Sequence, residues 1–144
     1  MVLVFCNSSS HSLRAFKWYL QSFHQASHTI CLLHVYCRPE NVDNAKYFHL
    51  LEEELQKTVA IMEKFKRICD KRRLQANIKT LPKVNSIGQT ICSFAKESHA
   101  ACVVLGQRGN GGVVKRTVFG GVSEFVLRHA HTPVVIVPPD KGQQ

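Results

Sequence analysis

The sequence predicts an α/β fold with a mainly parallel sheet, because short apolar segments alternate with amphipathic ones along the chain. Val2 to Cys6 is a continuous apolar run, as is typical of a strand buried on both faces. Two later segments, Thr29 to Tyr36 and Ala101 to Leu105, are rich in aliphatic residues. The stretches between such segments repeat apolar residues at helical spacing. A chain of 144 residues suffices for one domain with a substantial core.

The first half of the chain predicts strand, helix, strand and helix in that order. After the opening strand, a first helix repeats apolar residues at Leu13, Phe16, Leu20 and Phe23. The second strand, Thr29 to Tyr36, ends near Arg38 and Pro39, and a long helix from Asn44 to Arg72 follows. The apolar stripe of this long helix consists of Phe48, Leu51, Leu55, Met62, Phe65 and Cys69.

The second half predicts an edge strand, a helix, a buried strand, a helix and a last strand. From Ala76 to Thr80 polar side chains alternate with others, which is typical of a half-exposed edge strand. Ser86 and Gln89 form a capping-box signature at the start of the next helix. The apolar face of that helix contains Ile87, Ile91, Phe94 and Ala95. A helix from Val122 to Ala130 and a strand from Pro133 to Val137 complete the pattern.

The composition indicates a single cytoplasmic domain, which we expect to span residues 1–139, with a disordered tail at residues 140–144. The apolar runs are too short for a membrane span, and the N-terminus does not resemble a signal peptide. A net charge of +9 is compatible with nucleic-acid binding. However, the densest cluster of cations ends the long helix, suits its dipole and lacks interleaved aromatic residues. Nucleic-acid binding is therefore the weakest hypothesis. The cluster consists of Lys64, Lys66, Arg67, Lys71, Arg72 and Arg73.

Cysteine, histidine and serine patterns indicate neither a disulfide framework, nor a metal site, nor a catalytic machine. None of the six cysteines forms a C-x-x-C pair, so we expect free thiols that are mostly buried. We expect His34 to be a hydrogen-bonded core histidine, and His129 and His131 lack a neighbouring cysteine or carboxylate. The run from Ser8 to His11 lacks the oriented acid of a catalytic triad and suits a helix cap. We therefore expect that the protein is not an enzyme.

The most specific functional signal is a glycine-rich segment from Gly106 to Ser123, between a predicted strand and a predicted helix. Glycines allow the backbone to turn and to approach a ligand, and the helix start behind them presents N–H groups to an anion. We expect Gly106 and Gly109 to form the turn after the strand. The pattern predicts phosphate binding; the alternative is a loop that glycines merely shape. Neither the P-loop pattern nor the dinucleotide fingerprint is present. The cations that would suit a polyphosphate here are Arg108, Lys115, Arg116 and Arg128.

At these residues the chain resembles the universal stress protein family. The family's ATP-binding signature is glycine, two residues, glycine, nine residues, glycine and then serine or threonine; Gly106, Gly109 and Gly120 match its glycines in order. The resemblance implies a Rossmann-like, three-layer fold with a five-stranded parallel sheet in the order 3-2-1-4-5, and a homodimer formed through Pro133 to Val137. The resemblance extends over residues 2–137 and includes the segments 32–35, 103–109, 122–129 and 132–137.

The resemblance also implies an adenine-nucleotide site, with ATP, ADP or AMP as the ligand, with or without Mg²⁺. Adenine would contact the backbone at Val35, and Asn7 stands at the position of an aspartate that lines the family's site. The phosphates would lie against the glycine-rich segment. The residues expected in this site are Cys6, Asn7, Ser9, Val35, Leu105, Gly106, Arg108, Gly109, Gly120, Gly121, Val122 and Ser123.

Three departures from the family pattern leave two functions open. Ten residues, not nine, separate Gly109 from Gly120; Gly121 replaces the usual serine or threonine, and Asn7 replaces the aspartate. The leading hypothesis is a dimeric, nucleotide-binding stress-response module with at most weak ATP hydrolysis. The alternative is a dimerisation or scaffold protein whose nucleotide site has degenerated.

Overall fold

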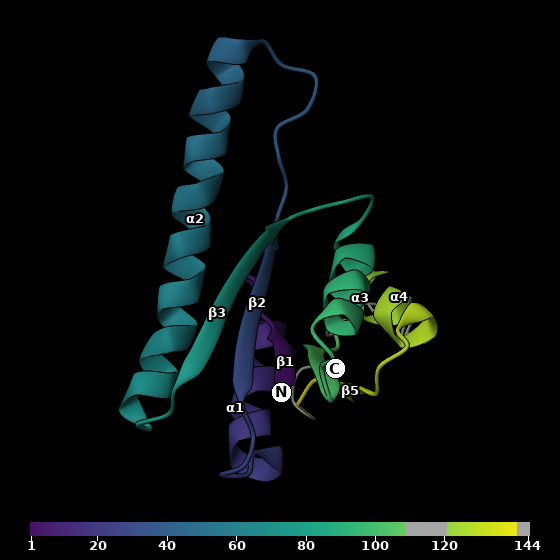
Figure 1. Ribbon diagram of the computed structural model, residues 1–144. Coiled ribbons are helices and arrows are strands. Elements are labelled where there is room, and N and C mark those ends of the chain that lie inside the picture. Colours follow the sequence, from purple (N-terminus) through teal and green to yellow (C-terminus); the bar gives the residue numbers. More distant parts are fainter. Residues whose placement is uncertain (109–120, 141–144) are drawn as a thin grey trace.

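The computed structural model describes residues 1–108 and 121–140, in which strands and helices alternate along the chain (Figure 1). The expected tail at residues 141–144 lies outside the described residues. So do four residues of the glycine-rich segment with expected phosphate roles: Gly109, Lys115, Arg116 and Gly120. In order, the elements are β1 (Val2–Phe5), α1 (Ser10–Trp18), the π-helix η1 (Tyr19–Phe23), β2 (Ile30–Tyr36), α2 (Asn44–Lys71), β3 (Ala76–Pro82), α3 (Ile87–Glu97), β4 (Cys102–Gly106), α4 (Gly121–His129) and β5 (Val134–Val137).

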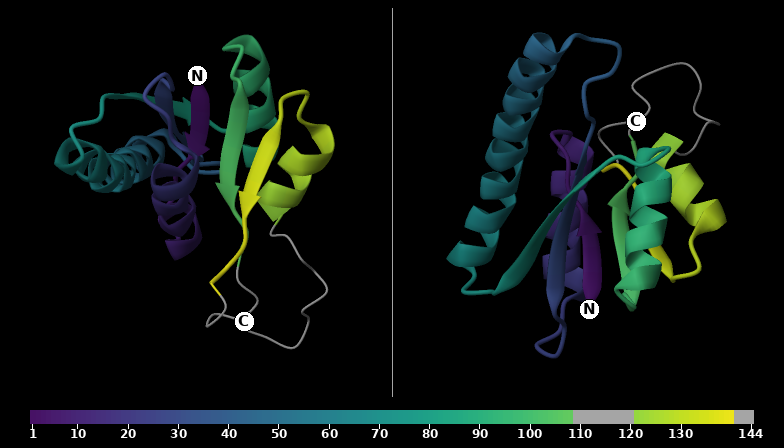
Figure 2. Two further views of the ribbon diagram at one scale, coloured as in Figure 1. Left: turned by 90° about the horizontal axis from the view of Figure 1, so that it is seen from below. Right: turned by 45° about the horizontal axis from the view of Figure 1, so that its top comes forward.

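All five strands form one parallel sheet in the order β3-β2-β1-β4-β5, which confirms the predicted fold class and strand order. Helices α1 and α2 cover one face of the sheet, and α3 and α4 cover the other (Figure 2). The direction of winding reverses between β1 and β4. In sheets of this kind a crevice opens at that point, beyond the carboxyl ends of the two strands.

Strand β1 is buried on both faces because its side chains alternate between the two helical layers. Val2 and Val4 pack in the layer of α1 and α2, whereas Leu3 and Phe5 pack in the layer of α3 and α4. All four residues are at most 5% exposed. This arrangement explains the continuous apolar run. Strand β3 lies at the edge of the sheet, as predicted, but it exposes all of residues 77–80, including Ile78, so the expected alternation of buried and exposed side chains is wrong.

Helix α2 buries only the second half of its apolar stripe. Met62 and Phe65 are at most 4% exposed, whereas Phe48 is 68% and Leu55 40% exposed. The first half of α2 runs past the strands beside it (Figure 1). The sequence pattern predicted one stripe, but the sheet covers only part of it. Although α2 has 28 residues, no helix in the described residues is both long and apolar enough to cross a membrane.

Side-chain caps start the helices where the sequence predicted them. Ser9 Oγ accepts a hydrogen bond from the backbone N–H of Ser12 at 3.4 Å, and Ser86 Oγ accepts from Gln89 at 3.0 Å. The capping box is only half formed, because the side chain of Gln89 donates to Ser93 Oγ at 3.2 Å instead. The caps fix the entry points of α1 and α3.

The predicted core roles of the cysteines and of His34 are confirmed. Five of the six free cysteines are buried, and Cys37 is exposed. Burial raises the pKa of the Cys6 thiol well above its ordinary value. His34 is buried, and its Nδ1 donates to the carbonyl oxygen of Cys6 at 2.8 Å. In the described residues no group of three potential ligands is placed to hold a metal ion.

Candidate functional site

A cleft opens at the carboxyl ends of β1 and β4, at the point where the winding reverses. Residues 7–12, which comprise the loop before α1 and its first turn, form one wall, which we call the α1 wall. The end of β4 and the start of α4 form the other, which we call the β4–α4 wall. The space between the walls is about 410 Å³ including its open mouth. The described residues that line it are Phe5, Asn7, Ser9, His11, Ser12, Leu105, Gly106, Arg108, Val122 and Ser123.

The structure brings most of the described expected site residues together. Those that line the cleft are Asn7, Ser9, Leu105, Gly106, Arg108, Val122 and Ser123. The sequence analysis missed Phe5, His11 and Ser12 as lining residues. A signal for the last two existed, because they lie two and three residues after the cap Ser9 and so occupy the first turn of a helix that starts at the crevice.

Three expected residues do not line the cleft. Cys6 is fully buried, and its side chain packs in the core beneath α1 and α2. Val35 is 3% exposed within β2. Gly121 is exposed as the first residue of α4, and a Cβ added there would meet nothing within 4 Å.

The backbone of Val35 faces the side of the sheet where β1 has ended. The backbone groups of a strand point alternately to its two neighbours. The carbonyl of Leu33 accepts from Cys6 on the β1 side, and the carbonyl of Tyr36 accepts from Lys83 on the β3 side. By this alternation the polar groups of Val35 point to the β1 side, which is compatible with the expected backbone contact to a base.

The α1 wall is a closed hydrogen-bond network. Asn7 Oδ1 accepts from the backbone N–H of Ser9 at 2.9 Å and from Ser9 Oγ at 2.6 Å. The buried Ser12 Oγ accepts from the Asn7 N–H at 3.2 Å and donates to the Asn7 carbonyl at 3.0 Å. Because the network uses Oδ1, the side-chain group that Asn7 retains for a ligand is the donor Nδ2.

Gly106 is required by close packing between the two walls. A Cβ at this position would lie 2.2 Å from the carbonyl oxygen of His11 and 2.6 Å from its carbon. Both atoms belong to the backbone of α1, so no side-chain rotation would relieve the overlap. Gly106 does not have a positive φ. The absence of a side chain at Gly106, the last residue of β4, lets α1 approach β4. The expected turn with Gly109 lies partly outside the described residues and stays a prediction.

Arg14 ties α1 to the ends of β4 and β5. Its Nη2 donates to the carbonyl of Gln107 at 2.8 Å, and its Nε donates to the carbonyl of Pro138 at 3.1 Å. Its Nη1 lies 3.3 Å from Nδ1 of His11. His11 is one of the residues that line the cleft. A guanidinium is thus fixed beside the cleft by two carbonyl groups far away in sequence.

The electrostatics of the cleft favour an anion. Burial, and then the charges of Arg14 and Arg108, lower the pKa of His11. The described residues that line the cleft include no carboxylate. The first turns of α1 and α4 add the partial positive charge of helix N-termini.

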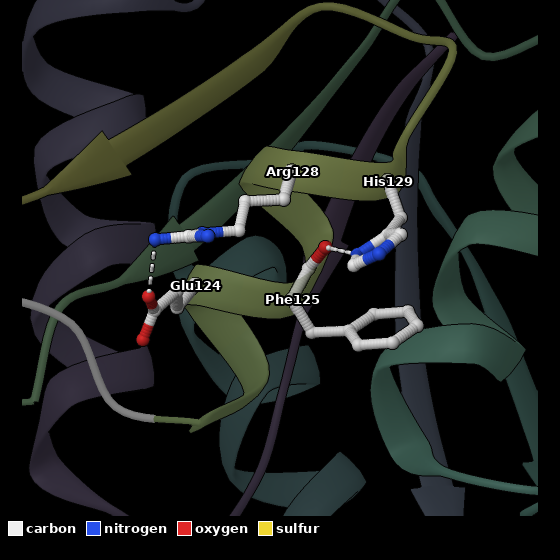
Figure 3. Close-up of polar contacts among 4 residues, drawn as sticks. All are labelled: Glu124, Phe125, Arg128 and His129. Atoms are coloured by element: carbon white, nitrogen blue, oxygen red, sulfur yellow. Dashed lines mark hydrogen bonds and ion pairs between the residues drawn. The ribbon is translucent and has the colours of Figure 1, made fainter.

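The expected phosphate role of Arg128 is not supported. Arg128 Nη2 forms an ion pair with Glu124 Oε1 at 3.0 Å on α4, as Figure 3 shows. One residue further on, His129 Nδ1 donates to the Phe125 carbonyl at 2.9 Å. Arg128 is also not among the described residues that line the cleft, which leaves Arg108 as the arginine among them.

Comparison with protein families gives one match over nearly the whole chain. Residues 1–138 match the model of the universal stress protein family. A universal stress protein of Synechocystis, Slr1101, is 38% identical over 58 residues, which is 40% of this chain and 53% of the relative. The chain thus spans about half the length of this curated relative.

Solved structures of the family share the fold. The universal stress protein UspA of Lactobacillus plantarum superposes with a TM-score of 0.77 at 19% identity, covering 94% of this chain and 95% of that one. A family member of Arabidopsis thaliana with AMP bound gives 0.70 at 23% identity, covering 98% and 92%. The Archaeoglobus fulgidus protein in complex with dAMP gives 0.68 at 15% identity, covering 94% and 95%.

Proposed function

The chain belongs to the universal stress protein family, and we propose that its cleft binds an adenine nucleotide. The observation that carries the proposal is the make-up of the cleft. Helix starts, the side chains of Ser9 and Asn7 and the cation Arg108 converge on it, and its described lining contains no carboxylate. Relatives with AMP and dAMP bound support the same ligand class.

The two ends of the ligand would find different surroundings. The phosphates would lie between the α1 wall and the start of α4, where backbone N–H groups and Arg108 balance their charge. The base would extend toward the β1 side of Val35, whose backbone offers both a donor and an acceptor. ATP, ADP and AMP share this arrangement. When ATP binds together with Mg²⁺, the phosphates and water molecules would hold the metal ion.

We propose a binding module rather than an enzyme. No residue pair in the described cleft places a general base beside a nucleophile, since Ser9 and Ser12 bond to each other's backbone and to Asn7. Any ATP hydrolysis would be slow.

We also propose a homodimer through β5, an edge strand whose residues Val134, Val135 and Ile136 are half-buried in the single chain. Light scattering should give twice the chain mass, and a monomer at micromolar concentration would overturn that part.

One observation favours the second candidate function, a scaffold that binds a protein. The first half of α2 exposes an apolar groove lined by Phe48, Leu51, Leu55 and Val59 among others. Exposed apolar patches with a polar rim often mark protein contacts. This function requires no nucleotide, so a titration separates the two candidates.

Isothermal titration with AMP, ADP and ATP at physiological salt tests the proposal. We expect saturable binding, weakened about tenfold or more by R108E, because a charge-assisted hydrogen bond becomes a repulsion. R67E is the matched control: it makes the same charge change on an exposed residue of α2 and should leave affinity unchanged. Absence of binding by all three nucleotides would contradict the proposal and favour the scaffold.

A further inference from the structure

The apolar stripe of α2 has the seven-residue repeat of a coiled coil. Its members follow one another at alternating steps of three and four residues, which keeps them on one side of the helix. The last four members are buried, whereas the first three lie in the half of α2 that runs past the strands (Figure 1). In order, the stripe consists of Phe48, Leu51, Leu55, Thr58, Met62, Phe65 and Cys69.

The uncovered part of the stripe forms a groove on α2 alone. Phe48 is 68%, Val59 55% and Leu55 40% exposed, so large apolar side chains face water here. Covering them removes apolar surface from water, which is the main driving force of protein association. The residues that line this groove are Phe48, Leu51, Glu52, Leu55, Gln56 and Val59.

Glutamates flank the groove on both sides. If the heptad positions are written a to g with Phe48 at a, Glu52 falls at e and Glu54 at g. In a coiled coil these two positions pair with charges of the partner helix. Within the described part of the chain neither carboxylate forms an ion pair. The lysines of this half of α2, Lys46 and Lys57, fall at f and c, away from the groove.

We propose that the groove binds a basic amphipathic helix of a partner protein. The apolar side of that helix would pack on Phe48, Leu51 and Leu55, whose spacing is that of a helix-binding surface. Lysine or arginine on its flanks would pair with Glu52 and Glu54. The free stretch, residues 48–59, is about 18 Å long, which suits a weak and reversible contact. None of the residues that line the groove lines the cleft, so this contact is independent of nucleotide binding.

A second copy of the chain fits the groove less well. In a parallel pair the partner's second half would run along the part of the stripe that the sheet already covers. Two copies could therefore pair only in antiparallel orientation, through residues 48–59 of each. Because Glu54 lies at the middle of this stretch, the two Glu54 side chains would meet near the symmetry axis. Like charges that face each other across an interface disfavour that partner.

Fluorescence anisotropy with two synthetic peptides tests the proposal, using the full chain without nucleotide. Both peptides have about three heptads with leucine at a and d; one carries lysine and the other glutamate at e and g. The like charges on its flanks keep each peptide from pairing with itself. We expect saturable binding of the lysine peptide, about tenfold tighter than that of the glutamate peptide, and a smaller difference at high salt.

Two substitutions on the same helix separate the groove from its surroundings. L55K places a charge inside the groove and should weaken the lysine peptide about tenfold or more. L50K is the matched control, because Leu50 is 38% exposed, close to the 40% of Leu55, but falls at c, outside the groove. It should leave the affinity unchanged. Since both leucines are exposed, both variants should keep the wild-type melting midpoint in circular dichroism.

Charge reversal tests the role of the flanking glutamates. E54K should weaken the lysine peptide and strengthen the glutamate peptide, whereas E53K makes the same charge change at f and should do neither. Equal binding of both peptides by the wild type, or equal effects of E54K and E53K, would overturn the proposal. So would a dimer, seen by light scattering of the chain alone, that L55K converts to a monomer, because that result would assign the groove to a second copy.

Discussion

The two walls of the cleft reach the same edge of the sheet by different means. The α1 wall is a network in which Asn7, Ser9 and Ser12 bond to one another's side chains and backbone. The β4–α4 wall contributes Gly106, whose missing side chain admits the α1 backbone, and the exposed Arg108. The α1 wall is held in place by hydrogen bonds, whereas the β4–α4 wall depends on the absence of a side chain at Gly106.

The difference indicates which changes each wall tolerates. Added volume at Gly106 should separate the walls, whereas the loss of one hydroxyl on the α1 wall should only loosen it.

G106A should destabilise the fold by about 3 kcal/mol, at the upper end of the cost of overpacking, because the new methyl would overlap backbone atoms of His11. Urea unfolding measures the change. G121A is the matched control on the same wall: nothing lies within 4 Å of its added methyl, so its effect should stay within about 0.5 kcal/mol. Equal effects of the two substitutions would refute the role of Gly106 in wall packing.

S12A should cost about 1–2 kcal/mol, because it removes a buried hydroxyl that both accepts from and donates to the Asn7 backbone. The exposed neighbour Ser8 provides the comparison, and S8A should change the free energy of unfolding by less than about 0.5 kcal/mol. A neutral S12A would mean that the network does not hold the α1 wall.

The smallest effect concerns pH. The folded state lowers the pKa of His11, and also that of His24 through burial and the proximity of His28. Below about pH 6.5 the unfolded chain therefore binds more protons, so these groups make the fold less stable as the pH falls through that value toward the lowered pKa values. In urea unfolding at pH 7.5 and 5.5, H11Q should lose less stability on acidification than the wild type. An identical loss would show that His11 is not perturbed in the fold.

The sequence predicted the β4–α4 wall better than the α1 wall. The glycine motif marked Gly106, Arg108, Val122 and Ser123, and the convergence of strand ends at a switch point brought Asn7 and Ser9 to the same place. His11 was not predicted, because helical periodicity does not reveal which first-turn side chain leans over the crevice. Arg14, which lies beside His11, binds carbonyl groups about ninety residues or more away in the sequence, and no local pattern reveals such contacts.

Two further differences have geometric causes. A continuous apolar run does not reveal which face each residue takes, so Cys6 was expected at the site but points into the core. Likewise, a 28-residue helix is about 40 Å long, whereas a seven-residue strand spans about 23 Å. The apolar stripe of α2 therefore continues beyond the sheet, and only its second half is buried.

The most direct test of the account is a titration of the isotope-labelled chain with AMP, followed through its backbone amide resonances. We predict saturable shifts concentrated at residues 7–12 and at Val122 and Ser123, the two walls of the cleft. Shifts confined to the exposed groove of α2 between Phe48 and Val59, or no saturable shifts at all, would contradict the assignment of this cleft as a nucleotide site.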